Sequence, residues 1–414
     1  MQKLELTWIG KGQEPAVEPR ILLHDASKDY GDPAAENMLI HGDNLLALKA
    51  LEQEFAGQVK CIYIDPPFNT QQAFDHYEDG LEHSTWLNLM YARLKLIKSL
   101  LSEDGTLFVH IDDNEFCYLI ALLDEIMGRS NRISIVTFKQ ASATGHKAIN
   151  PGVVNVTNFI LIYAKNKNLW QPHKLFTARE ERDKRYGQFI VNYDEPSENW
   201  EFTTLSKAFA SNLGLPERGI KKALGDEYES KLVEFVHDNA GRVIRLARPD
   251  YSAVSSSARD MIDLSREQTD TIFRLCREGY SDMYFYKGER ILFYSDKLKL
   301  IDGKYVSGEP LTSLWDDILS NNIHNEGGIE FPKGKKPETL IKRCVELCTN
   351  PGDLVLDSFL GSGTTAAVAH KMSRRYIGIE LGEHCYTHCL PRLKAVIDGE
   401  QGGVSKAQGW QGGG

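Results

Sequence analysis

The tetrapeptide Asp65-Pro66-Pro67-Phe68 places an acid, two rigid residues and an aromatic ring at the end of an apolar run. Two successive prolines cannot continue a strand ladder or lie inside a helix, so we expect a stiff, extended backbone. The carboxylate and a proline carbonyl can accept hydrogen bonds from an amino group while Phe68 stacks on a flat ring. The exocyclic amine of a nucleobase fits this description. Taken alone, the tetrapeptide is explained equally well by an acid and a turn that end a buried strand.

A glycine-rich turn follows a second apolar run. Residues 353–365 read DLVLDSFLGSGTT and lead into the helical pattern of residues 366–369. The order strand, glycine turn and helix is the nucleotide-cofactor element of doubly wound α/β folds. The turn lacks the third glycine of a dinucleotide fingerprint and the lysine of a phosphate loop. The pattern therefore predicts a cofactor that carries less negative charge.

A third apolar run, Tyr376–Glu380, also ends in an acid. An acid at the tip of the second strand is where a ribose diol is usually bound, so Glu380 is predicted to bind a cofactor ribose.

Alternating strands and helices are predicted to position these groups, which implies a parallel sheet. The expected strands and helices of the N-terminal part are the strand 37–41, the helix 45–55, the strand 59–64, the helix 86–101, the strand 105–111 and the helix 115–127. A further helix is expected at residues 339–348. Residues 71–83 lack periodicity and are predicted to form a mobile loop over the site.

The set of motifs resembles a known enzyme family. DPPF, FLGSGTT and IGIE together are similar to those of S-adenosylmethionine-dependent amino-methyltransferases of DNA. Because DPPF precedes the glycine motif, the chain resembles the β class, in which a Rossmann-like domain is circularly permuted. The wider sequence is most similar to modification (Mod) subunits of type III restriction systems. The segments that carry this likeness are residues 37–44, 61–70, 86–94 and 104–113.

The resemblance implies S-adenosylmethionine as cofactor and assigns residues to it. The methionine half would lie over the turn 359–363, and Asp43 would accept a hydrogen bond from the cofactor adenine. The cofactor-binding residues predicted in this way are Asp43, Lys336, Thr339, Asp357, Phe359, Gly361, Ser362, Gly363, Thr364 and Glu380. Asp357 would lie near the amino group, and Lys336 and Thr339 near the carboxylate. Asp43 is also explained as a helix cap, and Lys336 as a surface residue.

The resemblance also implies the reaction. Asp65 and the Pro66 carbonyl would bond the two amine hydrogens of an adenine flipped out of duplex DNA, with Pro67 keeping the backbone rigid and Phe68 stacking on the base. Aspartate in the first position favours adenine N6. Phenylalanine replaces the commoner tyrosine of the family and preserves stacking. Cytosine-N4 methylation and a catalytically silent DNA-binding subunit are the alternatives.

Four segments are expected. Residues 1–138 and 311–400 would form the two parts of a permuted α/β methyltransferase domain, 139–310 an inserted α+β target-recognition domain, and 401–414 a flexible tail. Lys and Arg outnumber Asp and Glu by 26 to 24 in the insert, against 22 to 34 elsewhere, which favours DNA contact through the insert. The tail resembles the point at which longer Mod subunits continue, which favours a truncated chain.

Composition and the resemblance predict the remaining partners. The chain has 414 residues, a net charge of −10 and seven cysteines, an odd number that is typical of a reducing cytoplasm. Cys344 and Cys348, like Cys385 and Cys389, have helical spacing; we favour buried pairs over zinc ligands and predict no metal. No membrane segment or secretory signal core is evident. A homodimer and an ATP-dependent restriction subunit are expected partners by resemblance alone.

Overall fold

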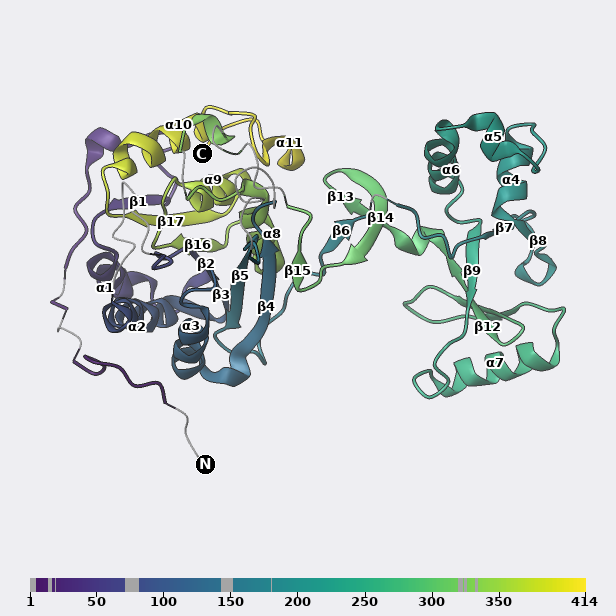
Figure 1. Ribbon diagram of the computed structural model, residues 1–414, viewed down its shortest axis with the longest axis horizontal. Helices are drawn as coiled ribbons and strands as arrows, with labels where there is room; N and C mark the ends of the chain where they lie inside the picture. The colour runs from purple at the N-terminus through teal and green to yellow at the C-terminus, as the bar shows by residue number, and fades with distance from the viewer. Residues whose placement is uncertain are drawn as a thin grey trace. The chain divides into compact units, whose positions relative to one another are not determined.

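The computed structural model describes residues 5–13, 17–18, 20–70, 82–142, 152–179, 181–318, 323, 326–331 and 334–414. The chain forms two compact units, described separately below (Figure 1). The first unit comprises residues 1–175 and 312–414, and the second comprises residues 176–311.

The first unit is built on an eight-stranded sheet in the order β1-β17-β16-β2-β3-β5-β4-β15. The strands in this order are β1 (Met38–His41), β17 (Arg375–Glu380), β16 (Leu354–Asp357), β2 (Val59–Ile64), β3 (Leu101–Ile111), β5 (Thr157–Ala164), β4 (Arg132–Lys139) and β15 (Leu314–Trp315). The first five are parallel, β5 is antiparallel to both of its neighbours, and β15 is parallel to β4.

The strand order reverses between β16 and β2. From β16 the chain runs through α9 (Thr364–Lys371) to β17 on one side, and from β2 through α2 (His83–Leu100) to β3 on the other. Such a reversal is where open α/β sheets bind ligands. Because β16 lies beside β2 in space but near the other end of the sequence, the predicted circularly permuted, Rossmann-like fold is confirmed.

Helices cover both faces of this sheet (Figure 1). On one face lie α1 (Asn44–Phe55), α2 and α3 (Phe116–Leu123), and on the other lie α8 (Glu338–Cys348), α9 and α10 (Leu390–Ile397). The alternation along β2 explains this arrangement. Ile62 and Ile64 join the apolar core with α1–α3, whereas Cys61 lies against Cys348 of α8. The strand is therefore buried on both faces.

The predicted elements are present with shifted ends. The second predicted helix begins earlier, and β3 begins at Leu101 instead of Gly105, because Leu101 pairs with Val59. The helix predicted at 115–127 is an α-helix followed by a π turn at Asp124–Gly128. The loop predicted at residues 71–83 lies almost wholly outside the described residues.

The second unit has two antiparallel sheets, in agreement with the predicted mixed composition. The six-stranded sheet, in spatial order, contains β10 (Phe273–Leu275), β11 (Met283–Tyr286), β12 (Glu289–Phe293), β9 (Val243–Ala247), β7 (Gln188–Ile190) and β8 (Phe202–Thr204). The three-stranded sheet contains β13 (Leu298–Ile301), β14 (Lys304–Pro310) and β6 (Phe176–Ala178). The helices are α4 (Leu205–Asn212), α5 (Ile220–Leu224), α6 (Glu227–Asp238) and α7 (Ser256–Glu267).

The second unit begins later in the sequence than residue 139. The segment before residue 176 belongs to the first unit, because β5 pairs with both β3 and β4. With these bounds, the balance of basic and acidic residues in the second unit is different. Residues 176–311 contain 21 Lys and Arg against 24 Asp and Glu, so the expected basic excess came from lysines of residues 139–175. The net charge of the second unit therefore does not by itself support DNA contact.

The prediction of a flexible tail at residues 401–414 is wrong. The segment includes α11 (Ser405–Gln408), and Val404 and Ser405 are buried. The Trp410 indole donates to the Val396 carbonyl at 2.8 Å, and the Gly413 amide donates to the Ile397 carbonyl at 2.8 Å. Glycines that adopt positive φ let the chain fold back onto α10 here, and Trp410 anchors it.

Within the described ranges, no helix is both long enough and apolar enough to cross a membrane.

Candidate active site

Four acids lie at the carboxyl ends of neighbouring parallel strands. Asp43 follows β1, Glu380 ends β17, Asp357 ends β16 and Asp65 follows β2. The register places His41 beside Glu380 and Leu356 beside Ile62, so these strand ends share one edge of the sheet. Residues 65 and 357 therefore flank the point at which the strand order reverses.

Among these acids, Asp357 is buried and its pKa is strongly raised. Its carboxylate is 3% exposed and accepts hydrogen bonds from the Phe359 amide at 2.9 Å and the Thr365 hydroxyl at 2.6 Å. Burial, with the negative charges of Asp65 and Glu380, raises the pKa of Asp357 to about 7. Asp357 is thus close enough to Asp65 and to Glu380 to be repelled by both charges, and a positively charged ligand would relieve that repulsion.

Asp65 is paired with Lys336. The Lys336 ammonium contacts Oδ2 of Asp65 and lies 5.1 Å from the centre of the Phe68 ring. Burial raises the pKa of Asp65, although the charge of Lys336 opposes the rise. Oδ1 of Asp65 is buried and has no hydrogen-bond partner among the described residues. One acceptor atom is therefore available, and the other is held by a cation that also lies over the aromatic ring.

The backbone after Asp65 is held from two directions. The indole of Trp86, which is fully buried, donates to the Pro67 carbonyl at 2.8 Å. Asn69 adopts a φ of +61°, which is unusual for a residue with a side chain. The side-chain amide of Asn69 donates to Glu115 at 2.6 Å. These contacts turn the chain after Phe68 and leave the Pro66 carbonyl as the candidate acceptor for an amine.

Phe68 is supported by a buried polar chain. Its ring lies 5.7 Å from the His110 ring, between centres. His110 is fully buried and bonds the Tyr63 hydroxyl at 2.9 Å and the Asn158 amide at 3.0 Å. Burial, with the charge of Lys336, holds the pKa of His110 well below its ordinary value. The imidazole is therefore neutral and acts as a fixed platform for Phe68.

The glycine turn lies beside Glu380. The Gly361 amide donates to Oε2 of Glu380 at 2.7 Å, and Gly361 and Gly363 have φ of +58° and +82°, which favour glycine. Ser362 and Thr364 are buried, and their hydroxyls are 3.1 Å apart. These hydroxyls face Arg392, so within the described structure they hold the turn rather than line the edge of the sheet.

A model of the DNA methylase family matches residues 59–389, which include both motifs. The chain belongs to the DNA methylase family. The resemblance inferred from the motifs is therefore confirmed.

Three curated relatives are similar to this methylase chain. The probable type III restriction-modification enzyme HindVI Mod subunit of Haemophilus influenzae is 38% identical over 407 residues, covering 93% of the chain and 53% of the relative. The type III EcoP15I Mod subunit of Escherichia coli is 25% identical, with coverages of 92% and 65%. The type II methyltransferase M.EcaI of Enterobacter cloacae is 26% identical, with coverages of 92% and 72%. The chain thus spans between half and two thirds of the length of these Mod subunits.

Two residues that were predicted to bind the cofactor, Glu380 and Asp43, have partners within the protein. Oε1 of Glu380 accepts from the Leu381 amide at 2.8 Å and lies 3.1 Å from Nε2 of His384, so this carboxylate also shapes the turn. Asp43 caps α1 by accepting from the Leu45 amide at 2.9 Å, and its second oxygen bonds Arg93 at 3.1 Å. Asp43 is therefore a helix cap, as the alternative interpretation of this residue predicted. Cofactor contacts of both acids stay predictions.

Lys336 and Thr339 lie in different surroundings. Lys336 pairs with Asp65, whereas Thr339 is exposed on α8. The neighbouring Lys335 points elsewhere and donates to the Ile329 carbonyl at 2.9 Å. Burial lowers the pKa of Lys335 to about 8. The predicted contacts of Lys336 and Thr339 with the cofactor carboxylate stay predictions.

Sequence reasoning missed several residues that shape the site. Trp86 and Arg93 lie in the segment quoted for the family resemblance, but nothing in the motif indicated that they would bond Pro67 and Asp43. His110 and Arg392 were detectable only as polar residues at buried positions of a strand and a helix. Cys344, Cys348, Cys385 and Cys389 are buried, as favoured, and no metal-binding cluster occurs in the described part of the chain.

Proposed function

We propose that this chain transfers a methyl group from S-adenosylmethionine to the N6 amine of an adenine flipped out of duplex DNA, within a restriction-modification system. The observation that supports it best is the position of Asp65 and Phe68. They follow β2, and the glycine turn follows the neighbouring strand β16, so both segments begin at the reversal point of the sheet, in a chain of the DNA methylase family.

The residues at the strand ends fit this cofactor. S-adenosylmethionine carries two positive groups, and Asp357 and Glu380, which lie within electrostatic reach of each other, supply negative charge. Gly361 and Gly363 have no side chain to block a ligand from approaching the turn. When bound, the cofactor supplies an activated methyl group on a sulfonium. Asp357 would hold its amino group, Phe359 would pack on it, and Glu380 and Asp43 would accept from its ribose and adenine.

Asp65 would act on the base. An adenine amine is a weak nucleophile because its lone pair is delocalised into the ring. Hydrogen bonds from the amine to Asp65 and to the Pro66 carbonyl favour a tetrahedral nitrogen whose lone pair is available for attack. Phe68 would hold the ring by stacking.

Lys336 lies where a base stacked on Phe68 would lie. Its ammonium donates to Oδ2 of Asp65 and lies over the Phe68 ring, whereas Oδ1 of Asp65 stays available to an amine. Stacking of the base on Phe68 would therefore displace the Lys336 ammonium. An ammonium released at this edge of the sheet would be available for the cofactor carboxylate, as the motif predicts.

Methyl transfer to DNA tests the proposal directly. Incubating the chain with duplex DNA and tritium-labelled S-adenosylmethionine, followed by nucleoside analysis, should give N6-methyladenine. Label in N4-methylcytosine would replace the proposed target by the alternative base. No label in DNA, with intact cofactor binding, would indicate a silent DNA-binding subunit. Single-molecule sequencing of DNA from expressing cells would then give the sequence context.

Cofactor binding should release a proton near neutral pH. Because the pKa of Asp357 is raised to about 7, part of the unliganded protein holds this carboxyl protonated at pH 7. The cationic amino group favours the ionised form, so we expect the affinity to fall as the pH drops below about 7. Calorimetry in two buffers of different ionisation enthalpy measures the released proton.

The matched variant for this prediction is Asp357→Asn, which has no carboxyl to titrate and should bind the cofactor without releasing the proton. The same raised pKa favours the folded state at low pH, and this contribution is lost as the pH rises through about 7. A wild-type enthalpy that does not depend on the buffer would contradict the assignment.

The second unit is proposed to recognise the target sequence. Exchanging residues 176–311 for the corresponding unit of a relative with another specificity should move methylation to the relative's sequence. As a control, the exchange of residues 139–175 alone should leave the sequence unchanged, because this segment packs with the first unit. A methylated motif that does not follow the second unit would refute the proposal.

The names of the relatives support a proposal about the protein partners of this chain. Two of the three relatives reported above are named as type III Mod subunits. We expect this chain to form a homodimer in which one copy reads the sequence while the other methylates. It would also bind an ATP-dependent restriction subunit. Light scattering in the presence of duplex DNA tests the dimer.

A further inference from the structure

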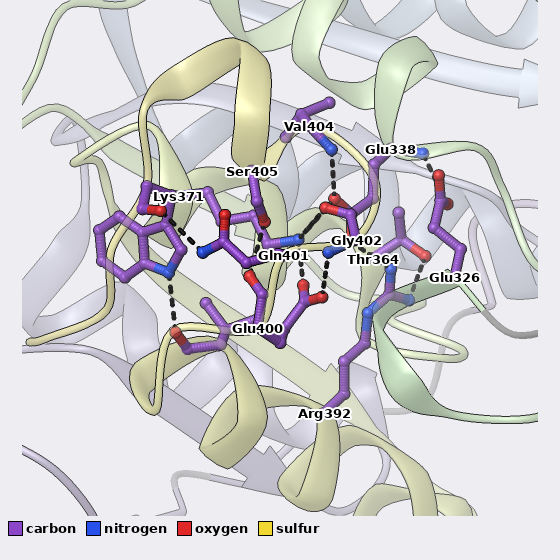
Figure 2. Close-up of polar contacts among 12 residues, drawn as sticks. Glu326, Glu338, Thr364, Lys371, Arg392, Glu400, Gln401, Gly402, Val404 and Ser405 are labelled. Carbon is purple, nitrogen blue, oxygen red and sulfur yellow. Dashed lines mark hydrogen bonds and ion pairs between the residues drawn. The ribbon is translucent and has the colours of Figure 1, made fainter.

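A buried ionic cluster holds the start of α9, directly after the glycine turn (Figure 2). It joins Glu338, the first residue of α8, to Lys371 at the end of α9 and to Arg392 in α10, and all three side chains are fully buried. Glu338 binds Lys371 at 2.8 Å through one oxygen and Arg392 at 2.7 Å through the other. None of these residues belongs to the predicted site.

Arg392 contacts the glycine turn directly. One end of its guanidinium donates to the Thr364 hydroxyl at 2.8 Å and to the Ser362 carbonyl at 3.2 Å. The other end donates to Glu338. The planar fork therefore fixes the turn and α8 at once, which a lysine ammonium at a single point cannot do. The turn is also held by Glu380, which accepts from the Gly361 amide.

Glu338 keeps this arginine in place. Burial alone would raise the pKa of Glu338, but Arg392 and Lys371 outweigh it and hold the pKa below its ordinary value, so the carboxylate is ionised. The Val404 amide also donates to Glu338 at 3.0 Å, and Lys371 contacts Glu400. The C-terminal segment thus belongs to the same cluster, as Figure 2 shows.

Stability alone is a poor explanation for this cluster. Replacing a buried ion pair by well-packed apolar residues is often neutral or stabilising. The arrangement is also imperfect, because Nε of Arg392 is buried and has no hydrogen-bond partner within the described residues. A buried cation with incomplete hydrogen bonding is costly, which is consistent with selection for the geometry of the turn.

We infer that Arg392 and Glu338 are positioning residues, which fix the glycine turn in the conformation that binds the cofactor. Arg392 acts through Ser362 and Thr364, and Glu338 acts through Arg392. The inference rests on the proposed function, because the ligand of the turn is S-adenosylmethionine there.

Arg392→Lys tests the inference, with cofactor binding as the readout. It keeps the charge and removes the fork, so we expect the Kd for S-adenosylmethionine to rise about tenfold or more, with faster amide hydrogen exchange confined to residues 358–366. Arg374→Lys is the matched control. Arg374 also braces the end of α9, donating to the Thr349 carbonyl at 2.6 Å and the Met372 carbonyl at 2.7 Å, but it does not contact the turn.

The outcomes separate the two proposals. Wild-type protein that does not bind S-adenosylmethionine would overturn the proposed function. Wild-type protein that binds it, with an equal Kd in Arg392→Lys or an equal rise in Arg374→Lys, would overturn the positioning role. If Arg392→Lys does not fold, Thr364→Val removes the hydroxyl that Arg392 holds and leaves the ion pair intact. It should raise the Kd by severalfold, and an unchanged Kd would overturn the inference.

Discussion

Asp65→Asn is expected to lower kcat by about 1,000-fold or more while leaving the Kd for S-adenosylmethionine within about threefold of wild type. Asparagine keeps the shape of the side chain but removes the charge and one acceptor of the amine hydrogens. Asp357 and Glu380, the two acids proposed to bind the cofactor most directly, belong to other strand ends, so we expect their contacts with it to persist. Single-turnover methyl transfer measures the first effect, and calorimetry measures the second.

Lys336 provides the control for this prediction. Because Lys336 pairs with Asp65, Asp65→Asn also leaves a cation without its partner. Lys336→Met removes that cation while retaining the carboxylate, and burial should then raise the pKa of Asp65 further, since the opposing charge is gone. This variant should keep measurable transfer with an activity profile shifted to higher pH. Loss of cofactor binding in Asp65→Asn would contradict the assignment of Asp65 to the base.

The positions of the acids were predictable because strand ends are visible in sequence. The apolar runs before Asp65, Asp357 and Glu380 predicted three parallel strands, and parallel strands bring their carboxyl ends to one edge. The partners of these acids were not predictable. The pairing of Lys336 with Asp65 joins residues 271 positions apart, and no local pattern encodes it. The Gly361 amide that donates to Glu380 comes from a turn whose conformation depends on tertiary contacts.

The sequence contains a pattern that indicates the ionic cluster: a charged residue within an apolar helical stripe. Arg392 continues the apolar stripe of Cys385, Cys389 and Val396, all of which are buried, at spacings of three and four residues. Glu338 begins a similar stripe on α8 that continues through Ile341 and Val345. A charged residue at a buried helical position requires a buried partner. Periodicity therefore indicates that such partners exist, although it cannot identify them across the chain.

Gly403→Ala is expected to destabilise the first unit by about 2–4 kcal/mol, although residue 403 lies in the segment predicted to be flexible. Gly403 adopts a φ of +52°, and a Cβ atom there would overlap Oε2 of Glu338. That oxygen accepts from Lys371 and from the Val404 amide, so its displacement leaves buried donors without their partner. Urea denaturation followed by tryptophan fluorescence measures the shift of the midpoint.

Gly409→Ala is the matched control for backbone strain. Gly409 lies in the same segment with a φ of +62°, but a Cβ atom there would meet nothing within 4 Å. It should therefore cost only the strain of a left-handed alanine, about 1 kcal/mol. The difference between the two variants isolates the contact with Glu338. Equal midpoints for both variants would mean that the C-terminal segment does not dock on the ionic cluster in solution.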